Sequence, residues 1–296
     1  MHPIQSPHGA AVAGSWRDRL RHSTAGRWFV AVTLIAVPFL AANILTKAFL
    51  DDPGLRDIRN LIKTLVLVGA YALYVRWWEQ RPVRELSTSG AFSEMLAGLL
   101  LGGLLFSAVV AVLSALGTYT VHSIGTLGDL GLVVSDMLAR IAAGAFIEEV
   151  LFRLLLLQLL ERSMGSAWAL VVSSIAFGLA HLGNEGATLW VSILLGVELG
   201  LLFGAAYLLT RRLWLCASLH LGWNFAQGPL FSIAVSGQTG ASWLQADLSG
   251  PAWLTGGAFG AEGSVVAVGV CLASTVLLLI LAKKRERRST LRGGRR

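Results

Sequence analysis

Charged residues are scarce in this sequence. Asp, Glu, Lys and Arg make up only 14% of its 296 residues, whereas 55% are hydrophobic and the mean hydropathy is +0.66. Soluble globular proteins carry about 25% charged residues. A chain with so little polar side-chain surface cannot cover a water-soluble core, so we predict an all-α polytopic membrane protein.

Several familiar catalytic signatures are also missing. The sequence contains no Gly-x-Ser-x-Gly, no His-Glu-x-x-His and no phosphate-binding glycine loop, so the expected parts of a rhomboid-like serine protease or of a zincin helix are lacking. There are two cysteines, Cys216 and Cys271, and both lie inside apolar runs. They provide no disulfide framework and no cysteine-based metal motif.

What the sequence does contain is long apolar runs. A helix needs about 20 apolar residues to cross the hydrocarbon core of a bilayer. Eight candidate spans satisfy this requirement: about 28–46, 58–78, 94–116, 130–160, 166–183, 187–210, 213–235 and 264–282. The fourth is too long for one straight crossing, so we expect it to tilt or to project from the membrane.

The basic residues indicate the orientation of these spans. If both termini are cytoplasmic, 18 of the 24 Lys and Arg residues face the cytoplasm, and the outer loops 117–129, 184–186 and 236–263 contain none. This bias is the one expected of a membrane protein. The basic residues from Lys283 onward directly follow an apolar helix, so we predict membrane lipids, and not nucleic acid, as their partner.

Ionisable side chains inside the apolar helices are the residues most suggestive of function, because a bilayer makes them costly. The fourth span carries Glu148, Glu149 and Arg153. Glu149 and Arg153 are four residues apart and can form an ion pair. Glu148 lies on an adjacent face, about 100° around the helix. Two acids against one arginine leave one carboxylate without a local partner, which argues against a purely structural role for both.

The fifth and seventh spans add further polar groups. His181 follows Phe177 by four residues, and Asn224 follows His220 by one helical turn. Path lengths of ~12 to ~22 Å from the inner edge put Glu148, His181, His220 and Asn224 in a similar layer. We therefore expect them to share one intramembrane polar cavity.

Two other features remain open. Glu198, in the sixth span, either joins this cavity or makes a structural hydrogen bond. The Ser/Gly/Ala-rich loop 236–263 is either a lid or a flexible connector, and we favour the connector.

These residue types suit the hydrolysis of an amide. A desolvated glutamate can serve as general base toward water, with a histidine orienting that water. A second histidine and an asparagine can donate hydrogen bonds to the oxyanion of a tetrahedral intermediate. Alternatively, Glu148, His181 and His220 bind Zn²⁺, which activates the water itself. The expected cofactor is therefore either none or zinc.

The ordered motifs Glu148-Glu149-x-x-x-Arg153, Phe177-x-x-x-His181 and His220-x-x-x-Asn224 resemble the CPBP family. This family comprises CAAX proteases and bacteriocin-processing or self-immunity (Abi) membrane proteins. The resemblance covers about 140–228, and the eight-helix layout is similar to that of the type II CAAX prenyl endopeptidase.

The resemblance implies an intramembrane peptidase, of the glutamate or the metallo type. Glu148 and His181 would activate water, and His220 and Asn224 would stabilise the oxyanion. The site would be supported by Glu149 and Arg153, together with Phe177 of the second motif. Substrates would be membrane-associated or prenylated-like peptides or proteins. The alternative function is a non-proteolytic bacteriocin self-immunity or scaffolding protein on the same fold. A proton-coupled transporter is a third, weakened by the lack of internal repeats.

The expected organisation has three parts. A basic cytoplasmic segment, 1–27, precedes a single transmembrane domain, 28–282, whose protease core spans about 130–235. A polybasic cytoplasmic tail, 283–296, follows. The Ala/Leu/Gly/Arg-rich composition favours a bacterial inner-membrane protein.

Overall fold

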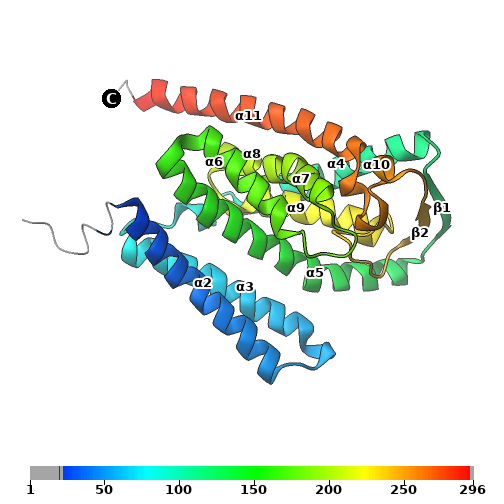
Figure 1. The fold of residues 1–296 in the computed structure, drawn as a ribbon, viewed down its shortest axis with the longest axis horizontal. Coiled ribbons are helices and arrows are strands. Elements are labelled where there is room, and N and C mark those ends of the chain that lie inside the picture. Colours follow the sequence, from blue (N-terminus) through cyan, green and yellow to red (C-terminus); the bar gives the residue numbers. More distant parts are fainter. Residues whose placement is uncertain (1–19, 21–22, 294–296) are drawn as a thin grey trace, which may run out of the picture.

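Long helices make up most of the protein (Figure 1). The computed structural model describes residues 20 and 23–293, without the side chains of 53, 136–142, 289, 292 and 293. The α-helices are α2 (Thr24–Phe49), α3 (Arg56–Leu73), α4 (Ala91–Ala115), α5 (Leu127–Glu149), α6 (Gln158–Ala180), α7 (Leu189–Leu195), α8 (Leu201–Thr210), α9 (Leu213–Phe225), α10 (Ala252–Thr255) and α11 (Val265–Gly293). Most of the predicted segment 1–27 and the end of the predicted tail, 294–296, lie outside the described residues.

Turns of π-helix extend several of these helices. They are η2 (Tyr74–Trp78), η4 (Val150–Leu157), η5 (Gly196–Gly200) and η6 (Ala226–Leu230). Short 3₁₀ turns are η1 (Pro53–Leu55), η3 (Arg84–Leu86), η7 (Gly257–Phe259) and η8 (Ala261–Gly263). With the π turns included, each of the eight predicted spans falls on helix. The fourth and fifth are joined in one helical run that breaks at Gly165 (φ 77°, ψ 166°).

Five helical segments of the described chain are long and apolar enough to cross a membrane: Thr24–Phe49, Arg56–Trp78, Ala91–Ala115, Leu189–Thr210 and Val265–Arg288. Large apolar side chains cover their outer faces; Phe29 is 69% exposed and Ile44 is 68% exposed. Exposure of this kind suits a lipid solvent and not water. The protein is therefore an all-α polytopic integral membrane protein, as predicted.

Helix α9 occupies the centre of the bundle, and nearly all of its residues are buried. It packs closely against α4 because glycines remove side chains from the contact. A Cβ added to Gly102 would lie 2.1 Å from the Leu219 carbonyl oxygen, and one added to Gly222 would lie 2.2 Å from that of Leu99. Small residues allow such close approach of helix backbones in membranes.

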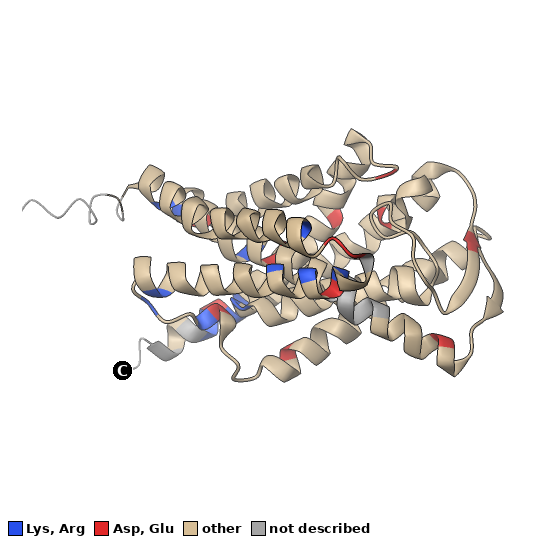
Figure 2. Ribbon diagram, turned by 90° about the horizontal axis from the view of Figure 1, so that it is seen from below, with Lys and Arg blue, Asp and Glu red and all other residues tan. Residues whose placement is uncertain are grey.

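The two sides of the molecule differ in charge. The described chain begins and finishes at the same end, as an even number of crossings requires (Figure 1). Figure 2 shows Lys and Arg at that end and in the middle of the molecule, with acidic residues but no basic ones where the strands lie. Segments 117–129 and 236–263, which form the second end, contain no Lys or Arg.

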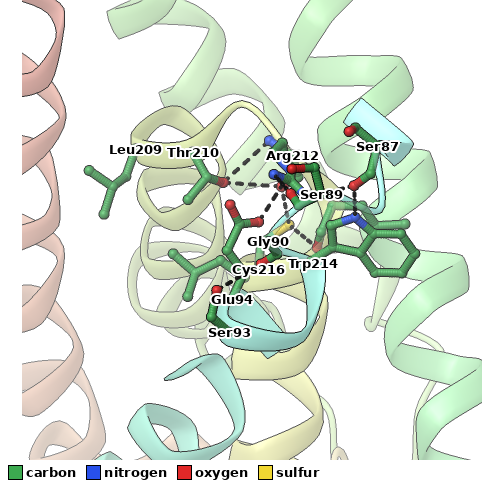
Figure 3. A network of polar contacts seen from close by, with 12 residues as sticks. Ser87, Ser89, Gly90, Ser93, Glu94, Leu209, Thr210, Arg212, Trp214 and Cys216 are labelled. Atoms are coloured by element: carbon green, nitrogen blue, oxygen red, sulfur yellow. Dashed lines mark hydrogen bonds and ion pairs between the residues drawn. The ribbon is translucent and has the colours of Figure 1, made fainter. Parts of the chain in front are cut away.

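Arg212 connects the start of α9 to the loop before α4 at the basic end of the molecule (Figure 3). Its guanidinium donates hydrogen bonds to the carbonyl oxygens of Ser87 and Ser89 and lies 3.4 Å from the Glu94 carboxylate. Trp214 donates from Nε1 to the same Ser87 carbonyl at 2.7 Å. The start of α9 is thereby anchored to the loop that precedes α4.

Two short strands interrupt the helical fold at the other end. Strands β1 (Tyr119–Ile124) and β2 (Leu244–Leu248) pair antiparallel, with Tyr119 opposite Leu248 and Ile124 opposite Leu244. Both segments belong to the predicted outer loops 117–129 and 236–263, where no strand was expected. The partners are more than a hundred residues apart, so no local pattern indicates that they pair.

The contact between α4 and α9 predicts a contrast between neighbouring glycines. Gly102→Ala should destabilise the protein by about 1–3 kcal/mol, because the added methyl meets backbone that cannot move aside. Gly103→Ala should be neutral or stabilising, since its Cβ has only one neighbour, at 3.9 Å. Thermal unfolding in detergent tests this, and equal transition temperatures for both variants would contradict the packing described.

Candidate active site

One cavity collects all four predicted catalytic side chains. It has a volume of about 210 Å³ and lies among α5, the end of α6, α9 with η6, and the segment that follows. Its lining consists of Gly144, Ala145, Glu148, His181, Asn184, His220, Asn224, Gly228, Pro229, Val235, Ser236, Gln238, Thr239, Gly240 and Ala241. Glu148 is the only formally charged group among these residues unless a histidine is protonated.

Both histidines point their Nε2 atoms toward Glu148. The Glu148 Oε2 atom lies 3.6 Å from Nε2 of His181 and 4.0 Å from Nε2 of His220. It has no hydrogen-bond partner within the described protein, although the Glu148 side chain as a whole is 30% exposed. Separations somewhat longer than a hydrogen bond are those that a bridging water fills.

The far side of each imidazole is fixed by a hydrogen bond. His181 is the C-cap of α6, and its Nδ1 lies 2.8 Å from the Phe177 carbonyl oxygen. Nδ1 of His220 lies 3.0 Å from the Glu149 carboxylate. Both acceptors require a proton on Nδ1, so in each neutral ring Nε2 carries the lone pair that faces the cavity.

The predicted ion pair between Glu149 and Arg153 lies behind the histidines. The Arg153 Nε atom is 3.1 Å from Glu149, and the two side chains are 1% and 0% exposed. Arg153 also donates to the carbonyl oxygens of Leu199 (3.4 Å) and Gly200 (3.2 Å). The pair thus connects α5 and η4 to η5, and through His220 to α9.

Aromatic rings complete this support. The Arg153 guanidinium lies 4.7 Å from the Phe177 ring centre, a cation–π contact, and the same ring is 4.9 Å from His181. Phe203 stacks on His220 with ring centres 4.4 Å apart. Phe177 was expected from its motif. Phe203 was missed, because one more phenylalanine in an apolar helix carries no sequence signal.

The segment 235–241 forms a wall of the cavity. Ser236 in this wall donates from its backbone N–H and its hydroxyl to Glu262, and its carbonyl accepts from Asn184 at 3.1 Å. Ser236 itself has a left-handed backbone (φ 48°). At Gly237 (φ 81°), a Cβ would lie 2.0 Å from the Glu185 carbonyl oxygen. The wall is therefore closely fitted to its neighbours, unlike the flexible connector that we favoured.

Glu262 was also missed. It is fully buried outside the spans, and burial raises the pKa of its carboxyl while the hydrogen bonds from Ser236 oppose the rise. The sequence signal available was a lone glutamate in a stretch otherwise poor in charge.

Glu198 differs from both expectations. It does not line the cavity, and within the described residues neither of its buried carboxylate oxygens has a hydrogen-bond partner.

Glu148, His181 and His220 are the residues that would hold a zinc ion in the cavity. A tetrahedral zinc ion bonded at about 2.0–2.2 Å holds its ligand atoms about 3.3–3.6 Å apart. The Glu148–His220 separation of 4.0 Å is wider. Across the part of the chain that the structure describes, no group of three or more His, Cys, Asp or Glu is arranged to hold a metal ion. The present geometry does not fit zinc, so we derive no step through a metal.

Comparison with known proteins bears on the same segment. Residues 130–226, about a third of the chain, match the family model described as type II CAAX prenyl endopeptidase Rce1-like. The resemblance to CAAX proteases is confirmed. The match covers Glu148, His181, His220 and Asn224 and supports a CAAX-type intramembrane protease function. No curated protein and no solved structure matches the chain.

The buried ion pair predicts a large loss of stability when one partner is removed. Arg153→Met leaves the Glu149 carboxylate uncompensated and should destabilise the protein by about 3–5 kcal/mol. Arg211→Met removes the exposed pair with Glu161 and should cost no more than about 1 kcal/mol. Thermal unfolding of the two variants in the same detergent measures the difference, and similar losses would show that burial of the Arg153 pair is unimportant.

The cavity wall predicts a local effect. Glu262→Ala leaves the Ser236 N–H and hydroxyl without their acceptor, at a cost of about 1–3 kcal/mol. Hydrogen exchange in 235–241 should then be about tenfold faster or more, while Glu185→Ala, which removes an exposed carboxylate next to the wall, leaves it unchanged. An unchanged exchange rate in Glu262→Ala would mean that Glu262 does not hold the wall.

Proposed function

We propose that the protein is an intramembrane endopeptidase that cleaves peptide bonds of membrane-associated or prenylated-like substrates with a water activated by Glu148 and His181. One observation carries the proposal: Glu148 of α5, His181 at the end of α6, and His220 and Asn224 of α9 line one cavity. The Rce1-like match of the same segment supports it.

The first step is activation of water. A water between Glu148 Oε2 and His181 Nε2 would be hydrogen-bonded by both, because these atoms are 3.6 Å apart. Glu148 accepts a proton from the water as its oxygen attacks the carbonyl carbon of the substrate. The hydrogen bond to Phe177 keeps the His181 ring in place and leaves its Nε2 lone pair to accept from the same water.

The second step is stabilisation and collapse of the tetrahedral intermediate. The Asn224 amide donates to the oxyanion from the cavity wall. His220, whose Nδ1 lies 3.0 Å from the Glu149 carboxylate, donates from Nε2 when that atom also carries a proton. As the carbon–nitrogen bond breaks, the proton held by Glu148 passes to the leaving amine.

The surroundings of the cavity support a membrane-associated substrate. The cavity lies within a helical protein in which other helices are long and apolar enough to cross a membrane, and no Lys or Arg lines it. We propose a bacterial inner-membrane setting with both termini cytoplasmic, supported by the basic end of the molecule. The partners are then membrane lipids and a peptide or protein substrate.

The function predicts separate effects for Glu148, which lines the cavity, and Glu185, which does not. Glu148→Gln removes the general base and should lower kcat by about 10²–10⁴-fold with the fold intact. Glu185→Gln, in the exposed loop after His181, should leave kcat unchanged. Asn224→Ala should lower kcat by about 10²–10³-fold. The measurement is cleavage of a prenylated peptide and a panel of membrane peptides by purified protein in liposomes.

The same cleavage assay in the presence of a chelator tests whether the reaction needs zinc. Cleavage that survives chelation but is lost in Glu148→Gln supports the glutamate-activated water. Cleavage lost on chelation and restored by Zn²⁺ would overturn it in favour of a metallopeptidase. If the folded wild-type protein cleaves nothing in the panel, the self-immunity or scaffolding function takes its place.

A further inference from the structure

A second hollow lies at the basic end of the molecule, apart from the catalytic cavity. It is a groove of about 760 Å³ between the end of α8 and the last turns of α11, closed by Arg84 of η3 and Ser166 of α6. It shares no lining residue with the catalytic cavity. Its volume is in the range that accommodates small ligands, about 300–1,000 Å³.

The floor of the groove is apolar and belongs to two membrane helices. Leu208 and Leu209 of α8 and Leu279 of α11 are half-buried there, packed against the core. The neighbouring outer face of α11 is open, since Leu277 is 57% exposed and Leu281 is 41% exposed. The floor therefore continues into the surface that the hydrocarbon of the bilayer covers.

The rim of the groove is basic. Both helices change from apolar to basic residues there: α11 passes from Leu281 to Lys283, and α8 from Leu209 to Arg211. The groove consequently lies at the depth of the lipid headgroups. Its lining contains four cations and one carboxylate: Arg84, Arg211, Lys283, Arg285 and Glu286.

These cations differ in how many hydrogen bonds and ion pairs they already make with the rest of the protein. Arg211 is held by two hydrogen bonds from its guanidinium to Glu161, at 2.6 and 2.8 Å, and Arg285 donates to the Leu209 carbonyl oxygen at 3.1 Å. Arg84 and Lys283 are exposed, and neither side chain has a hydrogen-bond or ion-pair partner among the described residues. The rim therefore keeps positive charge available above an apolar floor.

We propose that this groove is a binding site for one anionic glycerophospholipid of the surrounding membrane. The phosphate and headgroup lie between Arg84 and Lys283, with Arg285 beside them, and an acyl chain lies along Leu208 and Leu279. Basic pockets between membrane helices bind anionic headgroups through this combination of charge and apolar surface. The site does not depend on the proposed peptidase activity.

The test compares lipid binding by full-length variants in neutral detergent, measured by native mass spectrometry and by thermal stabilisation. Wild type should bind phosphatidylglycerol and gain stability from it, whereas phosphatidylcholine should have little effect. Arg84→Ala/Lys283→Ala should bind phosphatidylglycerol about tenfold more weakly or worse. Lys284→Ala is the matched control, because Lys284 is the next residue of α11 and does not line the groove. It should bind as wild type does.

A second variant separates a lipid from a free anion. Ala282→Phe fills the groove without changing its charge, so it should weaken phosphatidylglycerol binding while leaving any binding of inorganic phosphate as in wild type. Inorganic phosphate that stabilises wild type as well as the lipid does would overturn the lipid assignment. Equal losses in Lys284→Ala and the double variant, or undiminished binding in the double variant, would show that no groove-specific site exists.

Discussion

The burial of Arg153 is the constraint on which the rest of the site depends. A guanidinium inside a membrane protein is tolerated only when its charge and its N–H groups are met by the protein. Glu149 meets the charge, and the Leu199 and Gly200 carbonyls meet part of the donor capacity. Each partner comes from a segment that must approach Arg153 in a defined register. The ion pair therefore fixes the relative positions of the fourth and sixth predicted spans.

The same pair determines how the two imidazoles are oriented in the cavity. Glu149 uses one oxygen for Arg153 and the other for Nδ1 of His220, so a shift of the pair would turn the histidine. Phe177 contacts both the guanidinium and His181, while Phe203 stacks on His220. These flat contacts restrict ring rotation, which keeps the two Nε2 atoms directed at Glu148. Glu149 of the Glu148-Glu149 motif therefore holds neighbouring side chains in place, whereas Glu148 faces the cavity.

The parts of this arrangement that could be predicted from the sequence are those that depend on helical period and on the cost of polar groups in lipid. Hydropathy located the spans, and a spacing of four placed Glu149 beside Arg153 and His220 beside Asn224 on their helices. The sequence did not predict the cavity wall at 235–241, the role of Glu262 in anchoring it, or the pairing of the two strands. They depend on contacts between segments far apart in the chain, in stretches of Ser, Gly and Ala that carry no periodic signal.

π-helical turns lie beside the polar residues of the site. Each helical run that contributes to it has one beside the polar residues: η4 follows Glu149, η5 ends at Gly200, and η6 begins just after Asn224. A π turn disturbs the regular backbone hydrogen bonding, which makes carbonyl oxygens available to other donors. Arg153 donates to two carbonyls at the end of η5. Each carbonyl oxygen has two lone pairs, so these two oxygens can accept from the guanidinium in addition to a bond within the helix. A change that moved the backbone at the end of η5 would therefore displace two acceptors of Arg153 and weaken the support of His220 without altering a residue that lines the cavity.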